Sequence, residues 1–221
     1  LGGGLERSLG AHYRVADAKA EVGLPEVKIG ILPGAGGTQR LPRVVGLETA
    51  LNMIVSGASV PAGKLARTAL FDVVVDGDVV DAAVALLKEK IAAGGPHPRI
   101  RDRKVEHDDA EAFIAWARMG VAAASKNFPA PLRCVDAVAA SLKPFDAGMA
   151  VEREGFTVLL NSPESKALRH AFFGERAAGK IDDIGADVVQ RPIDRVGVIG
   201  AGTMGGGISM NFLNAGIPVV L

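Results

Sequence analysis

Residues 30–41 read Gly-Ile-Leu-Pro-Gly-Ala-Gly-Gly-Thr-Gln-Arg-Leu, a glycine-rich stretch that leads into an apolar run. Its segment 34–37 superficially has the spacing of a Gly-x-Gly-x-x-Gly phosphate turn, but Gln39 stands where that turn needs its third glycine. The stretch therefore serves another purpose, and the residues around it indicate which.

Two glutamates precede this loop. The segment Gly2-Gly3-Gly4-Leu5-Glu6 opens a predicted helical run, and Leu24-Pro25-Glu26 places a second glutamate 20 residues after the first. Most carboxylates in a chain of this composition are solvated surface groups. The spacing of the pair alone therefore does not indicate catalysis.

Taken together, the segments G-G-G-x-E, L-P-E and G-x-x-P-G-A-G-G-T-Q-R-L resemble the crotonase (enoyl-CoA hydratase/isomerase) superfamily. The resemblance implies an α/β fold in which residues 1–93 form the C-terminal half of a crotonase ββα spiral. It also implies that Glu6 and Glu26 are catalytic. By the same resemblance, Gly3 donates an oxyanion-hole N–H and Gly34 contributes a backbone group that lines the water site.

The implied reaction is the hydration of a trans-2-enoyl-CoA thioester to a 3-hydroxyacyl-CoA, with acyl-CoA as the partner. Negative charge develops on the thioester oxygen, and a backbone N–H at a helix N-terminus stabilises it. One carboxylate must deprotonate water while a carboxylic acid supplies the α-proton. We assign Glu6 chiefly to the water and Glu26 chiefly to the α-proton.

Two other functions stay open at this point. A Δ3,Δ2-enoyl-CoA isomerase needs one carboxylate to shuttle a proton, and Glu26 alone could do this. A non-catalytic binding or scaffolding member of the crotonase fold is the other alternative, although both glutamates are retained. Arg7 departs from the family, which usually has an apolar residue there, and Ala11 replaces a common cysteine. Consecutive helical residues face about 100° apart, so we expect Arg7 to point away from the site.

A second motif lies near the C-terminus. Residues 195–199 read Arg-Val-Gly-Val-Ile, a strand candidate, and residues 200–205 read Gly-Ala-Gly-Thr-Met-Gly before a helical run. This order is typical of a dinucleotide-binding turn, in which Gly200 permits the tight turn and Gly202 lets the backbone approach a pyrophosphate. Gly205 then allows the helix and the strand to pack closely.

Between the two motifs the composition becomes helical. Apolar periodicity predicts helices over 47–56, 79–93, 109–125, 131–142 and 147–160, and the run Val73–Val75 predicts a strand. Residues 177–194 lack periodicity and read as a linker. We therefore predict three parts: the hydratase segment 1–93, a helical region and linker 94–194, and the beginning of a Rossmann domain 195–221.

The resemblance extends beyond the first part. Lys166-Ala167-Leu168 and the segment 171–176, followed by the turn at 198–205, resemble the fusion of a hydratase with a 3-hydroxyacyl-CoA dehydrogenase. The subgroup with the greatest likeness is the peroxisomal-type multifunctional β-oxidation enzymes and their bacterial relatives. This implies NAD as the cofactor and a peroxisomal location in a eukaryote or a cytoplasmic one in a bacterium. The acid that would distinguish NAD from NADP is expected beyond Leu221.

Composition excludes several other classes. The 25 basic and 25 acidic residues give a formal charge of +0, so nothing indicates a nucleic-acid partner. The single cysteine, Cys134, reads as a buried small hydrophobe. No apolar run is long enough to span a membrane, and we expect no metal site because four histidines lack ligand spacing: His12, His97, His107 and His170.

Three further expectations concern the chain as a unit. It begins at Leu1 and ends in the apolar run 217–221, so both ends look like internal cuts. We expect the isolated segment to be inactive in both reactions, while its oligomeric state is left open. Phe113 and Trp116, three residues apart on a predicted helix, are expected in the core.

Overall fold

The computed structural model describes residues 1–221 except 182–184, 186–187 and 190. Part of the linker expected over 177–194 therefore lies outside the described residues. The chain divides into two compact units, Leu1–Ala177 and Ala178–Leu221.

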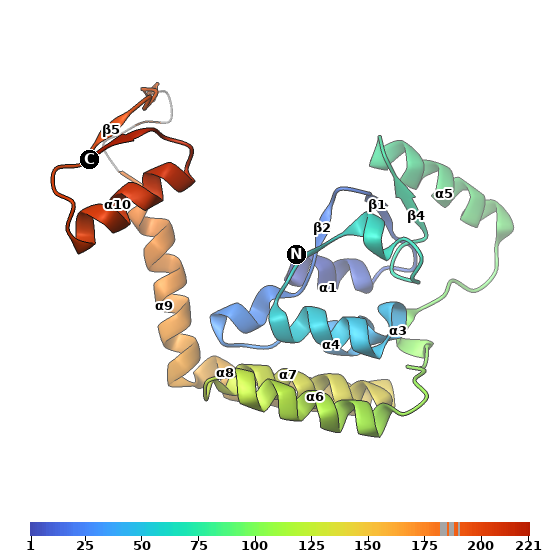
Figure 1. The fold of residues 1–221 in the computed structure, drawn as a ribbon. Coiled ribbons are helices and arrows are strands. Elements are labelled where there is room, and N and C mark those ends of the chain that lie inside the picture. Colours follow the sequence, from blue (N-terminus) through green and yellow to red (C-terminus); the bar gives the residue numbers. More distant parts are fainter. Residues whose placement is uncertain (182–184, 186–187, 190) are drawn as a thin grey trace. The chain divides into compact units, whose positions relative to one another are not determined.

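The first unit begins with short strands and helices in alternation (Figure 1). In chain order these are α1 (Gly3–Leu9), β1 (Val15–Asp17), β2 (Glu21–Val22), the 3₁₀ helix η1 (Pro25–Ile29), α2 (Gly37–Arg40), α3 (Pro42–Val45), α4 (Leu47–Ser56), β3 (Val60–Pro61), the 3₁₀ helix η2 (Ala62–Leu65), β4 (Val73–Val75) and α5 (Val79–Ala93). Strand β1 pairs in parallel with β4, and β2 pairs antiparallel with β3. The strand predicted at Val73–Val75 is confirmed.

A helical layer completes this unit. It comprises the 3₁₀ helix η3 (Ile100–Asp102), α6 (Ala110–Ala124), α7 (Pro129–Ala139), the 3₁₀ helix η4 (Ala140–Leu142), α8 (Phe145–Asn161) and α9 (Pro163–Ala178). Helix α7 packs between α6 and α8 and against α4, and Figure 1 shows α6, α7 and α8 lying along one side of α4. The layer therefore covers α4 and the glycine-rich loop that precedes it.

Local signals explain where the helices begin and end. Helix α5 is capped by Asp78, whose carboxylate accepts the N–H groups of Val80 and Asp81. Helix α4 ends at Gly57, which has a left-handed φ of 62°. The predicted ranges 47–56 and 79–93 match these two helices at both ends.

One continuous hydrophobic core holds the first unit together. Its fully buried large side chains come from the loops flanking η1, from the junction of α2 and α3, from α4 and from α7, and include Leu24, Leu32, Leu41, Leu47, Ile54, Val135 and Val138. Cys134 is buried in the same core, where burial raises the pKa of its thiol. It therefore acts as a small apolar side chain, as the sequence predicted.

The core prediction was wrong for Trp116, which is 68% exposed, while Phe113 packs against the core. The two residues are neighbours on one side of α6, with ring centroids 6.2 Å apart, but the packing elements reach Phe113 and leave Trp116 in solvent. Helix α5 shows a related effect, because Val80, Val84 and Ile91 are exposed although they recur at helical spacing. Periodicity identifies a helix but does not identify what covers each face.

The second unit is small. Strand β5 (Val196–Gly197) pairs in parallel with β6 (Val219–Val220), and α10 (Thr203–Asn214) connects them. This is the predicted order of strand, glycine turn, helix and strand. Across the described part of both units, no helix is both long and apolar enough to cross a membrane.

Candidate active site

Glu6 is held by the glycine-rich loop. Glu6 is a buried residue of α1. The backbone N–H groups of Ala35 and Gly37 both donate to its Oε1 atom at 2.8 Å. Hydrogen bonds to a charged acceptor are the strong kind, and two of them fix the carboxylate. Both bonds reach Oε1, and the described residues give Oε2 no hydrogen bond.

The glycines of the loop have a steric reason. Gly36 has a left-handed φ of 93°, which favours glycine, and it caps the N-terminus of α2. A Cβ on Gly37 would lie 2.8 Å from Glu6 Oε1 and 2.9 Å from a methyl carbon of Leu24. The glycines of the loop therefore allow its backbone N–H groups to reach Glu6. This contact, and not a phosphate turn, is what the glycine-rich stretch at 34–37 forms.

Glu26 lies at the start of η1, after Leu24 and Pro25. Its Oε2 atom is buried and has no hydrogen-bond partner among the described residues. Burial raises the pKa of Glu26 from its ordinary value of 4.5 to about 7, and the negative charges of Glu6 and Glu152 act in the same direction. Between these two pH values the side chain therefore keeps a proton that an ordinary glutamate has released.

The predicted backbone residues lie beside these carboxylates. Gly3 is the first residue of α1, and a Cβ on its neighbour Gly2 would lie 3.0 Å from Glu26 Oε1. Gly34 is exposed and directly precedes Ala35, the first of the two donors to Glu6. The structure therefore places Gly2, the residue before Gly3, beside Glu26, and Gly34 at the start of the loop that binds Glu6. Arg7 is exposed, as expected for a residue that points away.

A third glutamate, which the sequence reasoning missed, lies under the same loop. Glu152 of α8 is fully buried and accepts the N–H of Gly36 at 2.7 Å through Oε1. Its Oε2 accepts the N–H of Thr38 at 3.1 Å and the Thr38 hydroxyl at 2.5 Å. Burial raises the pKa of Glu152 to about 6, while these hydrogen bonds oppose the shift. Its signal in the sequence was one acidic residue on the face of α8 that also carries Gly148 and Gly155.

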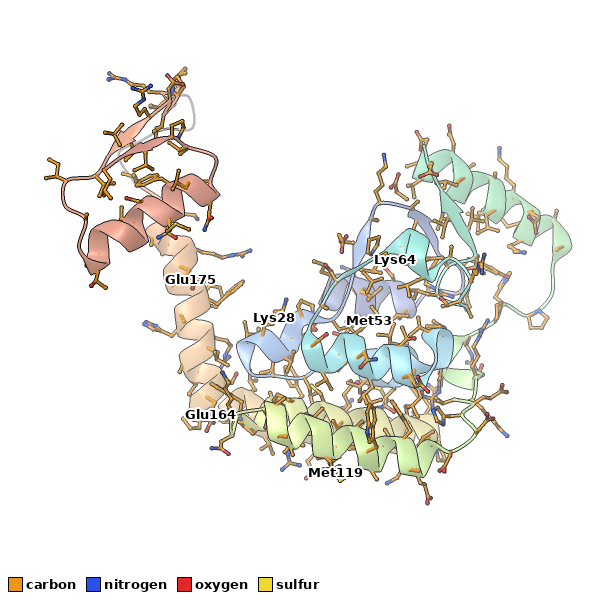
Figure 2. The ribbon with its side chains drawn as sticks, in the orientation of Figure 1. Lys28, Met53, Lys64, Met119, Glu164 and Glu175 are labelled. Carbon is orange, nitrogen blue, oxygen red and sulfur yellow. The ribbon has the colours of Figure 1, made fainter. Side chains whose placement is uncertain are left out.

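An apolar cavity of about 460 Å³ adjoins Glu26. Its walls come from η1 and α9, and include Pro25, Ile29, Leu168 and Phe172. Two charged residues, Lys28 and Glu175, also line it and are labelled on these two elements in Figure 2. The cavity is therefore mostly apolar, and the carboxyl group of Glu26 lies in its wall.

The next question is whether the histidines gather into a metal site. Within the residues that the structure describes, no group of three or more His, Cys, Asp or Glu side chains is arranged to hold a metal ion. His107 instead lies 3.3 Å from Glu48 and stacks on Phe113, and His97 contacts the Tyr13 hydroxyl at 3.2 Å.

The glycine turn of the second unit has the geometry that a pyrophosphate needs. Gly200 has a left-handed φ of 105°, and a Cβ on Gly205 would lie 1.8 Å from the Gly200 carbonyl oxygen. A Cβ on Gly202 would meet no atom of the described residues within 4 Å, so the backbone there is open to a ligand. Helix α10 starts at the next residue, Thr203, and directs its N-terminus at the turn. The residues present therefore fit the pyrophosphate of a dinucleotide.

Comparison with known families agrees with this geometry. Residues 1–111 match the family described as enoyl-CoA hydratase/isomerase, and the chain belongs to that family. Residues 195–221 match the family described as 3-hydroxyacyl-CoA dehydrogenase, NAD binding domain. The predicted fold is thereby confirmed as a crotonase-type α/β segment followed by the start of an NAD-binding domain. The internal boundaries at 93 and 194 stay predictions.

Three relatives illustrate the match. The whole chain is 42% identical to the peroxisomal bifunctional enzyme of Cavia porcellus and 39% identical to that of Homo sapiens, and it spans 31% of the length of each. The crystal structure of a carnitinyl-CoA hydratase from Mycobacterium avium is 29% identical, with a TM-score of 0.51 over 79% of this chain and 56% of that one. The resemblance to hydratase–dehydrogenase fusions is therefore confirmed over the full chain.

Proposed function

We propose that Glu6 and Glu26 catalyse the hydration of trans-2-enoyl-CoA to 3-hydroxyacyl-CoA. The observation that carries this proposal is the difference between their environments. Glu6 has one oxygen saturated by two backbone N–H groups and the other left for water, whereas the pKa of Glu26 is raised to about 7. Two nearby carboxyl groups in unlike environments can divide the work of base and acid.

The proposed steps balance as follows. Glu6 takes a proton from the bound water, and the water oxygen forms a bond to C3 of the enoyl group. The π electrons of the C2–C3 double bond move toward the thioester oxygen, where the Gly3 N–H stabilises the developing charge. Glu26 then gives its proton to C2, which restores the thioester carbonyl. The Gly34 backbone lines the space for the water.

The cavity beside Glu26 supports an acyl substrate. Apolar side chains from η1 and α9 line it, including Ile29, Leu168 and Phe172. Burying the methylene groups of an acyl chain there is favourable by about 0.8 kcal/mol per methylene. The same cavity brings the reacting end of the chain to Glu26.

Isomerisation between Δ3- and Δ2-enoyl-CoA is a second candidate reaction of the same site. A carboxyl group whose pKa is about 7 is divided between its acid and its base form near neutral pH. Glu26 can therefore remove a proton at one carbon and return it at another. This reaction does not require the water held by Glu6.

We propose further that the same polypeptide is an NAD-dependent 3-hydroxyacyl-CoA dehydrogenase. Gly200, Gly202 and Gly205 would hold the pyrophosphate, with the N-terminus of α10 facing its charge. The nicotinamide of bound NAD would accept a hydride from the hydroxyl-bearing carbon of the hydration product. By its relatives the protein is proposed to be peroxisomal in a eukaryote or cytoplasmic in a bacterium.

Residues 1–221 on their own are proposed to be inactive in both reactions. They span 56% of the length of the related hydratase structure and 31% of the bifunctional relatives. Among these residues only the Gly3 N–H is proposed as an oxyanion donor. The loss of one donor from an oxyanion hole lowers the rate by roughly 10²–10³. Measurable hydration of crotonyl-CoA by the purified 221-residue chain would contradict this point.

Hydration is tested in the product of the complete reading frame that encodes this chain. With crotonyl-CoA as the substrate, Glu26→Gln should lower kcat by roughly 10²–10⁴, because the amide has no acidic proton to transfer to carbon. Glu21→Gln, at an exposed position five residues earlier in the chain, is the matched control and should behave as wild type. Absence of hydration by the wild type, or full activity of Glu26→Gln, would rule the proposal out.

A further inference from the structure

We propose that Glu152 is a positioning residue for hydration, which sets the loop that holds Glu6 by accepting the backbone N–H groups of Gly36 and Thr38. This inference rests on the proposed function, and adds a third carboxylate that does not touch the substrate. Glu152 belongs to α8, outside the range 1–111 that matches the hydratase family.

The hydrogen bonds of the loop alternate between two carboxylates. Ala35 and Gly37 donate to Glu6, whereas Gly36 and Thr38 donate to Glu152. Four consecutive backbone N–H groups are therefore shared between α1 and α8. Neither pair of bonds can form unless the loop keeps one backbone conformation, so the position of Glu152 constrains the donors of Glu6.

Glu152 is built into this position on both of its oxygens. Its side chain is 0% exposed, and the Thr38 hydroxyl adds a third donor at 2.5 Å. A buried carboxylate without such partners would be costly. The buried charge of Glu152 is thus stabilised by the N–H and O–H donors of the loop. In turn, Glu152 holds those donors in place.

The rest of α8 fits the loop around this contact. A Cβ on Gly148 would lie 2.0 Å from the Gln39 side-chain oxygen, and one on Gly155 would lie 2.9 Å from a methyl carbon of Leu32. Gly148, Glu152 and Gly155 recur at helical spacing on one face. The two glycines leave room for residues 32–39, and Glu152 between them directs its carboxylate at the backbone of that loop.

Charge gives Glu152 a second effect on the site. Its negative charge is one of the causes that raise the pKa of Glu26. Removing that charge should lower the pKa of Glu26, so the acid loses its proton at a lower pH. A residue that merely filled space would not have this effect.

The test compares Glu152→Gln with Glu154→Gln, an exposed glutamate on the same helix, in the product of the complete reading frame. A misplaced catalytic group typically costs about 10²-fold in rate, so Glu152→Gln should lower kcat for crotonyl-CoA by about this factor. KM should change far less. The decline of kcat/KM at high pH should begin at a lower pH than in wild type, and Glu154→Gln should show neither change.

Hydrogen exchange separates this inference from the proposed function. Peptides that cover residues 34–40 should exchange faster in Glu152→Gln than in wild type, whether or not the protein hydrates enoyl-CoA. Missing wild-type hydration would overturn the proposed function alone. Wild-type kcat and pH profile in folded Glu152→Gln, or unchanged exchange over this loop, would overturn the role of Glu152.

A second variant covers the case in which Glu152→Gln does not fold. Thr38→Val keeps the shape of the side chain but removes the hydroxyl donor to Glu152. Loss of one hydrogen bond to a charged group should lower kcat by about tenfold and speed exchange over the loop. Unchanged kcat and exchange in Thr38→Val would overturn the proposal.

Discussion

Gly37 donates its backbone N–H to Glu6 Oε1 at 2.8 Å, and a Cβ on Gly37 would lie at the same distance, 2.8 Å, from that oxygen. Residue 37 can therefore donate this hydrogen bond to Glu6 only if it has no side chain. Any larger residue would push the carboxylate away from the donors that orient it.

Gly37→Ala should therefore impair hydration without unfolding the protein. The added methyl displaces Glu6, and we expect kcat to fall by about 10²-fold. The matched control is Gly4→Ala, because a Cβ there meets no described atom within 4 Å. Steady-state assays with crotonyl-CoA and a thermal melt of each variant check the prediction, which fails if both variants keep wild-type kcat.

The two glutamates proposed to be catalytic, Glu6 and Glu26, should differ in their effects on two substrates. Glu26→Gln should impair both the hydration of crotonyl-CoA and the isomerisation of a 3-enoyl-CoA, each by roughly 10²–10⁴ in kcat. Glu6→Gln should abolish hydration but leave isomerisation partly intact, since only hydration needs a water held by Glu6. Equal loss of isomerase activity in both variants would contradict the assignment of water to Glu6 and of the α-proton to Glu26.

The raised pKa of Glu26 should appear in the stability of the protein. Between 4.5 and about 7 the folded state keeps a proton that the unfolded chain releases. The free energy of unfolding of wild type should therefore fall, relative to Glu26→Gln, as pH rises through this range, and should change little above it. Urea unfolding of both proteins at about pH 4 and about pH 8 measures the difference. An identical pH dependence would show that the pKa of Glu26 is not raised.

NAD binding should depend on the open position in the glycine turn. Gly202→Val places a branched side chain where the backbone must approach the pyrophosphate, so dehydrogenase activity should be lost while hydration stays close to wild type. Gly207→Ala, in the helix that follows and with no described atom within 4 Å of its Cβ, should keep both activities. Titration of the protein with NADH, together with both assays, checks this. A large fall in hydration at unchanged thermal stability would contradict it.

Local order was well predicted from the sequence. Helices α4 and α5 have the predicted ends because glycine and aspartate caps act within one turn. The turn at Gly200 follows from equally local rules, since φ and the close approach of Gly205 involve neighbouring residues. Such features need no knowledge of what packs against them.

Contacts between distant segments were not predictable in the same way. Glu152 lies 116 residues from Gly36, and nothing local to α8 identifies the amide groups that it meets. Trp116 was expected in the core and is exposed for the same reason, because a helical pattern does not specify which elements cover it. Glu6 and Glu26 were identified through the family resemblance, whereas their spacing alone gave no such indication.

Helix α8 also bears on how the protein can be divided. A truncation placed where the hydratase family match ends, at residue 111, would keep Glu6 and Glu26 but discard Glu152. Two N–H groups of the loop would then lose their acceptor. The smallest fragment that preserves these hydrogen bonds must therefore include Glu152 of α8, which lies beyond the stretch of sequence by which the family is recognised.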